Sequence, residues 1–231
     1  MAGRPVALIT GGSRGVGASI ARALAPEYDL LLGGRESTAL QQICTELGAR
    51  PWPVELTDER AVAEAAAGVE RLDVLVHSAG VARLGTVAEL PVSAWREMFE
   101  VNVTAVAGLT RRLLPALRAA RGHVVMINSG SGQRAAAGWG AYAASKFALR
   151  ALADALRLEE EGEGLRVTTV YPGRIDTDMQ RSVREQEDGE YEPGKYLRPE
   201  SVARAVLAAL RAGEEAHLTE ITVRPAAGPL T

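Results

Sequence analysis

The sequence predicts an α/β fold of the doubly wound type, with a parallel sheet of about seven strands and helices on both faces. Short apolar runs, often β-branched, alternate with longer stretches of helical periodicity along almost the whole chain. Because these runs do not alternate with polar residues, we expect each strand to be buried on both faces, as in a parallel sheet. No change of composition, linker or internal repeat interrupts the pattern. It therefore predicts one domain over residues 1–231.

The composition is that of a soluble globular protein and excludes several other classes. The 231 residues are 47% hydrophobic and 24% charged, which is enough to form one large core. A net charge of -3 without a basic stripe argues against a nucleic-acid partner. Cys44 is the only cysteine, which excludes an intramolecular disulfide and a cysteine-based metal site, so we expect no metal. No apolar run approaches the roughly 18 residues that span a bilayer, and no signal-peptide core is visible, so we expect a cytoplasmic protein with no membrane partner.

The first half of the chain, about 1–120, is the expected cofactor half. Its first helix follows a glycine-rich turn and ends near Pro26, while Thr57 and Asp58 are candidate caps for the helix that runs to residue 67. Pro115 lies near the end of its longest helix. The expected strands are 6–10, 30–32, 51–56 and 72–77, and the expected helices are 15–25, 37–47, the helix up to 67, and 93–117.

The second half, about 121–231, is the expected catalytic and substrate half. Its clearest helix is 142–161, because apolar residues recur on one stripe from Phe147 to Leu156. Strands are expected at 124–128, 165–171 and 220–224, and a last helix at 199–211. The stretch 176–198 has no regular pattern and is rich in charge. It is either a lid over a site or a solvated loop.

A glycine-rich turn follows the first strand directly and opens the first helix. Its glycines, Gly11, Gly15 and Gly17, have the spacing G-x3-G-x-G. Such a turn lets the backbone approach a pyrophosphate at the helix N-terminus, and its position in an alternating α/β chain favours a phosphate cradle over a simple turn.

Two arginines near this turn indicate which dinucleotide binds. An acid at the end of the second strand usually receives the ribose 2′-hydroxyl of NAD. Here the strand ends in Gly33-Gly34-Arg35, and Arg14 lies within the glycine turn. Two guanidinium groups at one corner suit a 2′-phosphate, so the sequence favours NADP(H) over NAD, although each arginine could simply be exposed.

The candidate chemistry lies at Tyr142 and Lys146, which a helix places on the same face at positions i and i+4. An ammonium beside a phenol stabilises the phenolate, so we expect the pKa of Tyr142 to be lowered toward neutrality. Ser129 ends the fifth strand, at the sheet edge where ligands bind in such folds. Its hydroxyl can donate to a substrate carbonyl while Tyr142 delivers a proton.

These motifs together resemble the short-chain dehydrogenase/reductase family, Rossmann-fold enzymes, and in particular its NADP-preferring members. The resemblance runs from the first strand to about Thr177 and includes Asn102 on the long helix, Ala79-Gly80, and the segment from Pro172 to Thr177. It implies an oxidoreductase that interconverts a small or medium ketone or aldehyde and the alcohol by hydride transfer, and we favour the reductive direction.

The resemblance also assigns roles to single residues. It makes Tyr142 the general acid/base and Ser129 the group that orients the substrate oxygen. Lys146 is then expected to lower the pKa of Tyr142 and to bind the nicotinamide ribose, and Asn102 to bend its helix and complete a proton relay. The expected cofactor-binding residues are Gly11, Ser13, Arg14, Gly15, Val16, Gly17, Arg35, Glu55, Leu56, Ala79, Gly80, Tyr142, Lys146, Pro172, Gly173, Ile175 and Thr177.

The chain departs from the family pattern at three places. His77-Ser78 stands where the family has Asn-Asn, and we interpret His77 as structural rather than as a base. Glu55 replaces the usual Asp, which makes its adenine contact uncertain. The end of the chain lacks the Val-Asp-Gly-Gly of oxoacyl-carrier-protein reductases, which argues against a role in fatty-acid synthesis and leaves a homotetramer in doubt. The resemblance implies at least a homodimer through the fourth and fifth helices.

Several residues near the predicted site keep two interpretations. Trp139 and Met179 form an apolar wall for the substrate, or they are respectively loop packing and a lid anchor. Arg83 and Arg134 bind a substrate anion, or they are surface charges. The main alternative function is a dinucleotide-binding sensor or interaction module with little turnover. The presence of all four expected catalytic side chains argues against it.

Overall fold

Seven strands form one parallel sheet in the computed structural model, which describes residues 3–213 and 215–226. The strand order is β3-β2-β1-β4-β5-β6-β7, so the predicted doubly wound fold is confirmed. The order reverses between β1 and β4, and the loops that leave these two strands diverge to opposite faces, which is where ligands bind in such sheets. The strands are β1 Val6–Thr10, β2 Asp29–Gly34, β3 Arg50–Pro53, β4 Val74–His77, β5 His123–Ile127, β6 Arg166–Pro172 and β7 Glu220–Val223.

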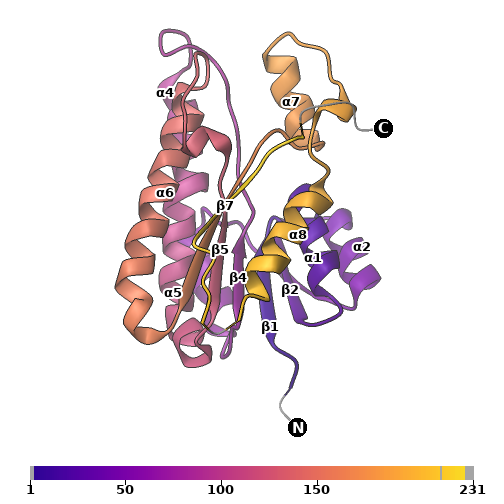
Figure 1. The fold of residues 1–231 in the computed structure, drawn as a ribbon, viewed down its shortest axis with the longest axis vertical. Helices are drawn as coiled ribbons and strands as arrows, with labels where there is room; N and C mark the ends of the chain where they lie inside the picture. The colour runs from indigo at the N-terminus through magenta and orange to yellow at the C-terminus, as the bar shows by residue number, and fades with distance from the viewer. Residues whose placement is uncertain (1–2, 214, 227–231) are drawn as a thin grey trace.

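Helices cover both faces of the sheet (Figure 1). One face packs against α1 (Gly15–Leu24), α2 (Thr38–Leu47) and α8 (Pro199–Leu210), through buried residues such as Ile20 and Val206. The other face packs against α3 (Glu59–Ala67), α5 (Ala105–Ala120) and α6 (Gly140–Glu160), through residues such as Leu109. Burial of apolar side chains on both faces explains why the strands show no polar alternation.

The long helix expected over 93–117 is divided into three parts. It consists of α4 (Val92–Phe99), a π-helical turn (Glu100–Thr104) and α5, which continues past Pro115. The π-turn inserts an extra residue into the helical ladder, a feature that is often found at functional sites. Asn102 is its central residue, so the helix is irregular at the position where the family resemblance implies a bend.

The stretch 176–198 was expected to be irregular, and this expectation is wrong for its first half. Residues Asp178–Gln186 form the nine-residue helix α7, and Pro193–Lys195 form a 3₁₀ turn. Only Met179 and Val183 are hydrophobic in α7, so its sequence gives almost no periodic signal. The helix forms because Thr177 caps its N-terminus and Val183 packs into a buried cluster.

Three smaller expectations are also decided. Asp58 caps α3 by accepting hydrogen bonds from two backbone amides, as predicted. Cys44 is 4% exposed within the core, which confirms its role in packing. The third strand ends at Pro53, three residues earlier than the predicted Leu56. Within 3–213 and 215–226, no helix has both the length and the apolar character that crossing a membrane requires.

Candidate active site

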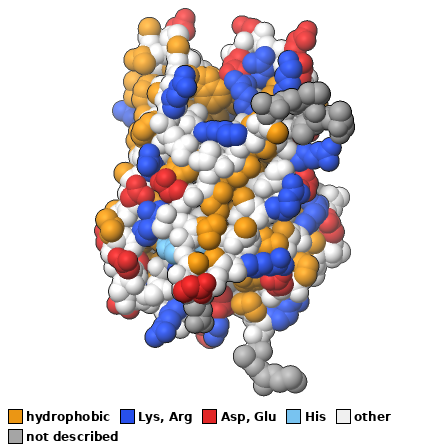
Figure 2. All heavy atoms as spheres, viewed as in Figure 1, with side chains coloured by type: hydrophobic (Ala, Val, Ile, Leu, Met, Phe, Trp, Pro, Cys, Tyr) orange, Lys and Arg blue, Asp and Glu red, His pale blue; other side chains and the backbone are white. Residues whose placement is uncertain are grey.

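The carboxyl ends of the strands meet at the end of the molecule that also carries α4 and α7, uppermost in Figure 1. Figure 2 shows this end hollowed between two lobes, with hydrophobic side chains in the hollow and arginine and lysine side chains around it. The glycine turn, Ser129 and the start of α6 all lie at this edge, because each directly follows or adjoins a strand end.

The glycine turn has a backbone that other residues could not adopt. Gly11 and Gly15 have φ values of +65° and +55°, in the left-handed region. A Cβ atom on Gly17 would lie 2.2 Å from the carbonyl oxygen of Gly11, and one on Gly11 would lie 2.9 Å from Cα of Ala79. The turn therefore packs closely against its neighbours, and only glycine fits at these positions.

The N-terminus of α1 is open for an anion. Arg14 occupies the N-cap position but makes no capping hydrogen bond with its side chain. The first-turn amides, which include those of Val16 and Gly17, have no partner within the helix. Together with the helix dipole, such amides form a site for a phosphate group.

The two arginines that were expected to select NADP(H) are both exposed. Arg14 lies 3.7 Å from Asp178 at the start of α7, in an ion pair whose side chains are 72% and 70% exposed. Arg35 follows β2, and a Cβ on the neighbouring Gly34 would lie 3.8 Å from Oγ of Ser13. The glycine turn and the end of β2 are thus adjacent. Arg35, the first residue after β2, therefore lies at the corner that these two segments form.

Three of the remaining expected cofactor contacts have local partners. Glu55 is exposed beyond β3 and accepts a hydrogen bond from the Thr57 hydroxyl at 3.2 Å. The hydroxyl of Thr10 accepts from the amide of Ala79 at 3.3 Å, which joins the ends of β1 and β4. A Cβ on Gly80 would lie 3.1 Å from Oδ1 of Asn102. Ala79 and Gly80 therefore lie between the glycine turn and Asn102.

Tyr142 and Lys146 lie in the first two turns of α6 and are almost completely buried. Their exposed fractions are 8% and 4%, and Nζ of Lys146 lies 5.9 Å from the centroid of the Tyr142 ring. The Ser129 side chain lies near enough to the Tyr142 phenol to lower its pKa, so the expected acid and the residue expected to orient the substrate are neighbours. Three of the four predicted catalytic residues are thus brought together by β5 and α6.

The pKa values differ from the expectation. Burial raises the pKa of Tyr142, and the neighbouring Ser129 side chain lowers it only in part. Burial also lowers the pKa of Lys146 to about 8, because a charged ammonium is poorly solvated there. The expected lowering of the Tyr142 pKa is therefore absent from this structure. Desolvation of the buried phenol is the largest cause of the shift.

Asn102 is held by a loop that follows β4. It is 1% exposed, its Oδ1 accepts from the Val81 amide at 2.9 Å, and its Nδ2 donates to the Val81 carbonyl at 3.0 Å. Nδ2 also lies 3.1 Å from Oγ of Ser145, which in turn donates to the carbonyl of Tyr142 at 2.7 Å. The π-turn is thereby connected to the turn of α6 that carries Tyr142 and Lys146.

The segment after β6 runs beside the glycine turn. A Cβ on Gly15 would lie 3.5 Å from Cγ2 of Thr177. The amide of Gly173 donates to Val223 at 2.8 Å, which fixes the chain just past Pro172, and Ile175 forms an isolated bridge with Leu197. The predicted nicotinamide segment therefore adjoins the phosphate cradle.

A hydrophobic cluster surrounds Tyr142 and joins the side of the hollow that carries α4 to the side that carries α7. Its buried members come from the loop after β4, from α4, from α6 and from α7 (Ala82, Met98, Ala141, Tyr142 and Val183). Trp139 packs against it and meets the Tyr142 ring edge to face, with centroids 5.8 Å apart. Trp139 is thus an apolar wall beside the phenol, whereas Met179 is 44% exposed.

Ion pairs hold α7 over this cluster. Arg174 binds both carboxylate oxygens of Glu187 at 2.7 Å, and its guanidinium lies 5.5 Å from the centroid of the Trp139 ring. Arg184 binds the same carboxylate at 2.6 Å. The amide of Leu84, in the loop between β4 and α4, donates to Gln186 at 2.9 Å. The end of α7 therefore reaches the other side of the hollow. Of the two interpretations of 176–198, the contacts favour a cover over the site.

The other candidates occupy ordinary structural or surface positions. His77 is 3% exposed, its Nε2 lies 2.9 Å from Oγ1 of Thr110, and burial lowers its pKa to about 3, so it is a neutral structural side chain. Arg83 pairs with Glu97 at 3.0 Å, as a surface charge does. Arg134 is exposed.

Sequence reasoning missed several residues that the structure places at the site. These are Asn128 and Ser145, which are buried and hydrogen-bonded next to the predicted tetrad, and Arg174 and Glu187, which hold α7. A polar residue at the end of an apolar strand was the available signal for Asn128. No comparable signal exists for Glu187, whose partner lies in another segment.

The comparison with known protein families decides the identity of the fold. The family model described as short chain dehydrogenase matches residues 5–188. The chain belongs to the short-chain dehydrogenase family. The resemblance of its motifs is thereby confirmed, and the seven-stranded sheet and its strand order are those of a Rossmann-like dehydrogenase.

This short-chain dehydrogenase is similar to characterised proteins of different kinds. It is 36% identical over 240 residues to the glycine betaine reductase ATRR of Emericella nidulans; the match covers 97% of this chain but only 19% of that longer protein. An alcohol dehydrogenase from Thermococcus sibiricus, solved with 5-hydroxy-NADP, is 29% identical with a TM-score of 0.86, over 98% of this chain and 99% of that one. An actinorhodin polyketide ketoreductase, solved with NADPH, is 27% identical with a TM-score of 0.89, over 97% and 98%.

Proposed function

We propose that this chain is an NADP(H)-dependent oxidoreductase that reduces a small or medium ketone or aldehyde to the alcohol. The observation that carries the proposal is the buried Tyr142, which lies one helical turn from Lys146 and near Ser129, at the same sheet edge as the glycine cradle. Relatives solved with NADP, NADPH or a derivative support the choice of cofactor.

The residues present fit a dinucleotide. The glycine turn is tight enough that a Cβ at Gly17 would collide with the Gly11 carbonyl, and the amides of the first turn of α1, which have no partner within the helix, would bind a pyrophosphate. Arg14 and Arg35 would hold a 2′-phosphate, and Thr177 and Ile175 would hold the nicotinamide end beside Gly15. When bound, NADPH supplies the hydride.

The protein side of the reaction is proton transfer and orientation. Ser129 donates a hydrogen bond to the carbonyl oxygen and fixes it near Tyr142, whose phenol donates the proton as charge develops on that oxygen. The raised pKa of Tyr142 keeps the phenol protonated at neutral pH, which suits an acid in the reductive direction. Lys146 holds the ribose and stabilises the phenolate left behind. Asn102 connects this group to the loop after β4 and completes the relay.

The apolar cluster and the exposed residues of α6 support two further parts of the proposal, the kind of substrate and the oligomeric state. The apolar cluster around Tyr142, with Trp139 as a wall, suits a substrate with a hydrophobic body. Phe147 and Leu158 are 42% and 75% exposed on α6, which suits a homodimer through α5 and α6. We also propose that the enzyme acts in the cytoplasm.

A fluorescence titration with NADPH and NADH, followed by a carbonyl panel scored by loss of NADPH absorbance, tests the proposal. We expect NADPH to bind about tenfold more tightly than NADH, a difference of ~1.4 kcal/mol, and at least one ketone to be reduced. Tight NADPH binding without turnover across the panel would favour the sensor alternative. Binding of neither nucleotide would refute the cofactor assignment.

A further inference from the structure

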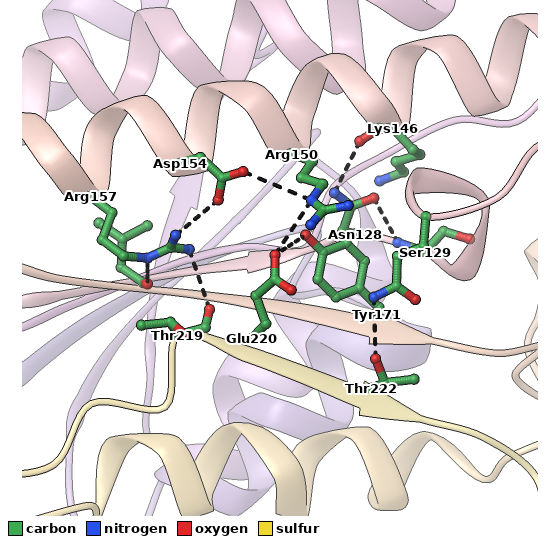
Figure 3. Close-up of polar contacts among 12 residues, drawn as sticks. Asn128, Ser129, Lys146, Arg150, Asp154, Arg157, Tyr171, Thr219, Glu220 and Thr222 are labelled. Carbon is green, nitrogen blue, oxygen red and sulfur yellow. Dashed lines mark hydrogen bonds and ion pairs between the residues drawn. The ribbon is translucent and has the colours of Figure 1, made fainter.

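Asn128, the residue that follows β5, connects two predicted catalytic residues through its side chain. Its Oδ1 accepts a hydrogen bond from the Ser129 amide at 2.8 Å, and its Nδ2 donates to the backbone carbonyl of Lys146 at 3.0 Å. Figure 3 shows both contacts, with Asn128 between the turn of Ser129 and the helix α6. The side chain is 4% exposed, so water does not compete for either bond.

Lys146 is fixed to the end of β5 at both of its polar ends. Its Nζ donates to the carbonyl of Ile127 at 3.2 Å, and its own carbonyl accepts from Asn128. Two consecutive residues of one strand end therefore bind the ammonium and the backbone of the same lysine. This arrangement fixes both where the ammonium lies and how far α6 stands from the sheet.

Asn128 itself has little freedom to move. Its backbone amide donates to the carbonyl of Val170 at 2.8 Å, which extends the β5–β6 ladder by one residue. A Cβ on Gly132 would lie 2.4 Å from Oδ1 of Asn128, so the backbone of the following turn closes over the amide. A rigid sheet thus supports the side chain from one side and Gly132 confines it from the other.

We propose that Asn128 is a positioning residue that sets Ser129 and Lys146 in register with each other across the gap between β5 and α6. The inference rests on the proposed function, because it gives those two residues their roles. Only a side chain with one donor and one acceptor at this branching makes both bonds. A carboxylate would accept from Ser129 but could not donate to Lys146, and an aliphatic side chain would do neither.

The charged and titratable groups around this register are few among the described residues. Lys146 faces the Tyr142 ring, and Arg174 lies on the Trp139 ring, where Glu187 neutralises it. The guanidinium of Arg224 lies beside Gly130 and donates to Gln133 at 3.2 Å. If the bond from Asn128 is lost and the Lys146 carbonyl moves, the effect on Tyr142 and on the ribose site therefore comes mainly from the changed position of the Lys146 ammonium.

An NADPH fluorescence titration tests the proposal without requiring turnover. Asn128→Ala should weaken NADPH binding about tenfold, the loss expected when one charged contact is misplaced. In a Lys146→Met background the same change should have an effect of about twofold or less, because the residue acts through Lys146. Asn128→Leu, which keeps the branching at Cγ, provides a second variant if the alanine protein does not fold.

Thr168→Val is the matched control. Thr168 is completely buried in β6, and its Oγ1 donates to the Leu218 carbonyl at 2.6 Å and lies 2.7 Å from His123. The variant loses buried hydrogen bonds and should lower the melting temperature as Asn128→Ala does, with NADPH affinity unchanged. For a carbonyl that the wild type reduces, Asn128→Ala should lower kcat about 10- to 100-fold. Thr168→Val should leave kcat within about twofold.

Two results would overturn the inference: NADPH affinity unchanged in a folded Asn128 variant, or a loss of equal size with and without Lys146. Failure of the proposed function looks different. If the wild type reduces no carbonyl, the reductase assignment fails, while the titration cycle still decides whether Asn128 positions Lys146.

Discussion

The start of α6 and the helix α7 border the same hollow, but different forces hold them in place. Around α6, buried side chains are bound mainly to backbone groups, as Asn128 is to Lys146 and Asn102 is to Val81. At α7, the contacts are ion pairs of partly exposed side chains, with Arg174 38% and Glu187 17% exposed. The first arrangement is insensitive to salt, whereas the second is screened by it.

We infer that the two regions serve different tasks, proton transfer at the start of α6 and substrate entry at α7. Proton transfer requires atoms to be placed within a fraction of an ångström, and buried hydrogen bonds to a sheet provide that precision. Substrate entry requires a segment that can open, and ion pairs near the surface contribute little stability each. We therefore expect changes near α6 to affect kcat and changes in α7 to affect KM.

The largest effect among the contrasting variants is expected at Ser129, on the rigid side. Ser129→Ala removes the donor to the substrate oxygen and should lower kcat about 100-fold, with NADPH affinity unchanged. Ser131→Ala is the control, because Ser131 contacts the Ser129 hydroxyl with its backbone amide. Steady-state kinetics measure both. A loss of less than about threefold would mean that Ser129 does not orient the substrate.

An intermediate effect is expected at the phosphate corner. The double variant Arg14→Ala, Arg35→Ala should weaken NADPH about tenfold or more and leave NADH nearly unchanged, because only NADPH carries the 2′-phosphate. Fluorescence titrations at one salt concentration measure the ratio. Equal losses for both nucleotides would remove the argument for NADP(H) preference.

The smallest effect is expected at the α7 cover. Glu187→Gln breaks the pairs with Arg174 and Arg184 and should raise KM about threefold with kcat unchanged. It should also lower the melting temperature by about 2–4 °C at pH 7, the shift that ~1 kcal/mol gives in a chain of this size. A change in kcat with KM unchanged would contradict the separation of tasks.

The same variant has a defined pH dependence. The hydrogen bond with Arg174 lowers the pKa of Glu187 below its usual range, and Arg184 adds to this. A lowered pKa in the folded state contributes stability that is present above the ordinary value of ~4.3 and is lost as the pH falls through the lowered pKa. The difference in melting temperature between wild type and Glu187→Gln should therefore shrink as the pH falls below ~4.3, and vanish once the pH is below the lowered pKa. A constant difference down to about pH 3 would contradict this account.

Sequence reasoning was most successful where backbone geometry dictates residue type. Gly11, Gly15 and Gly17 were predicted because a tight turn requires glycine. In the structure, a Cβ atom on Gly11 or Gly17 would collide with neighbouring backbone atoms. Tyr142 and Lys146 could be placed on one helix face by spacing alone. The fold followed from the unbroken apolar strands, since both faces of the sheet are covered.

The α7 cover could not be predicted in this way. Its helix is stabilised by Val183 entering a cluster built from distant segments and by Glu187 reaching Arg174, and neither contact leaves a local pattern. The direction of the Tyr142 pKa shift was also missed, because a spacing of four residues shows the neighbouring charge but not the degree of burial.

The central claim, that Tyr142 is the proton donor of an NADP(H)-dependent reductase, is tested most directly by Tyr142→Phe. The account predicts that kcat for carbonyl reduction falls about 1,000-fold, while the Kd for NADPH stays within about twofold of the wild type. A Tyr142→Phe protein that binds NADPH normally and keeps most of its activity would contradict the claim.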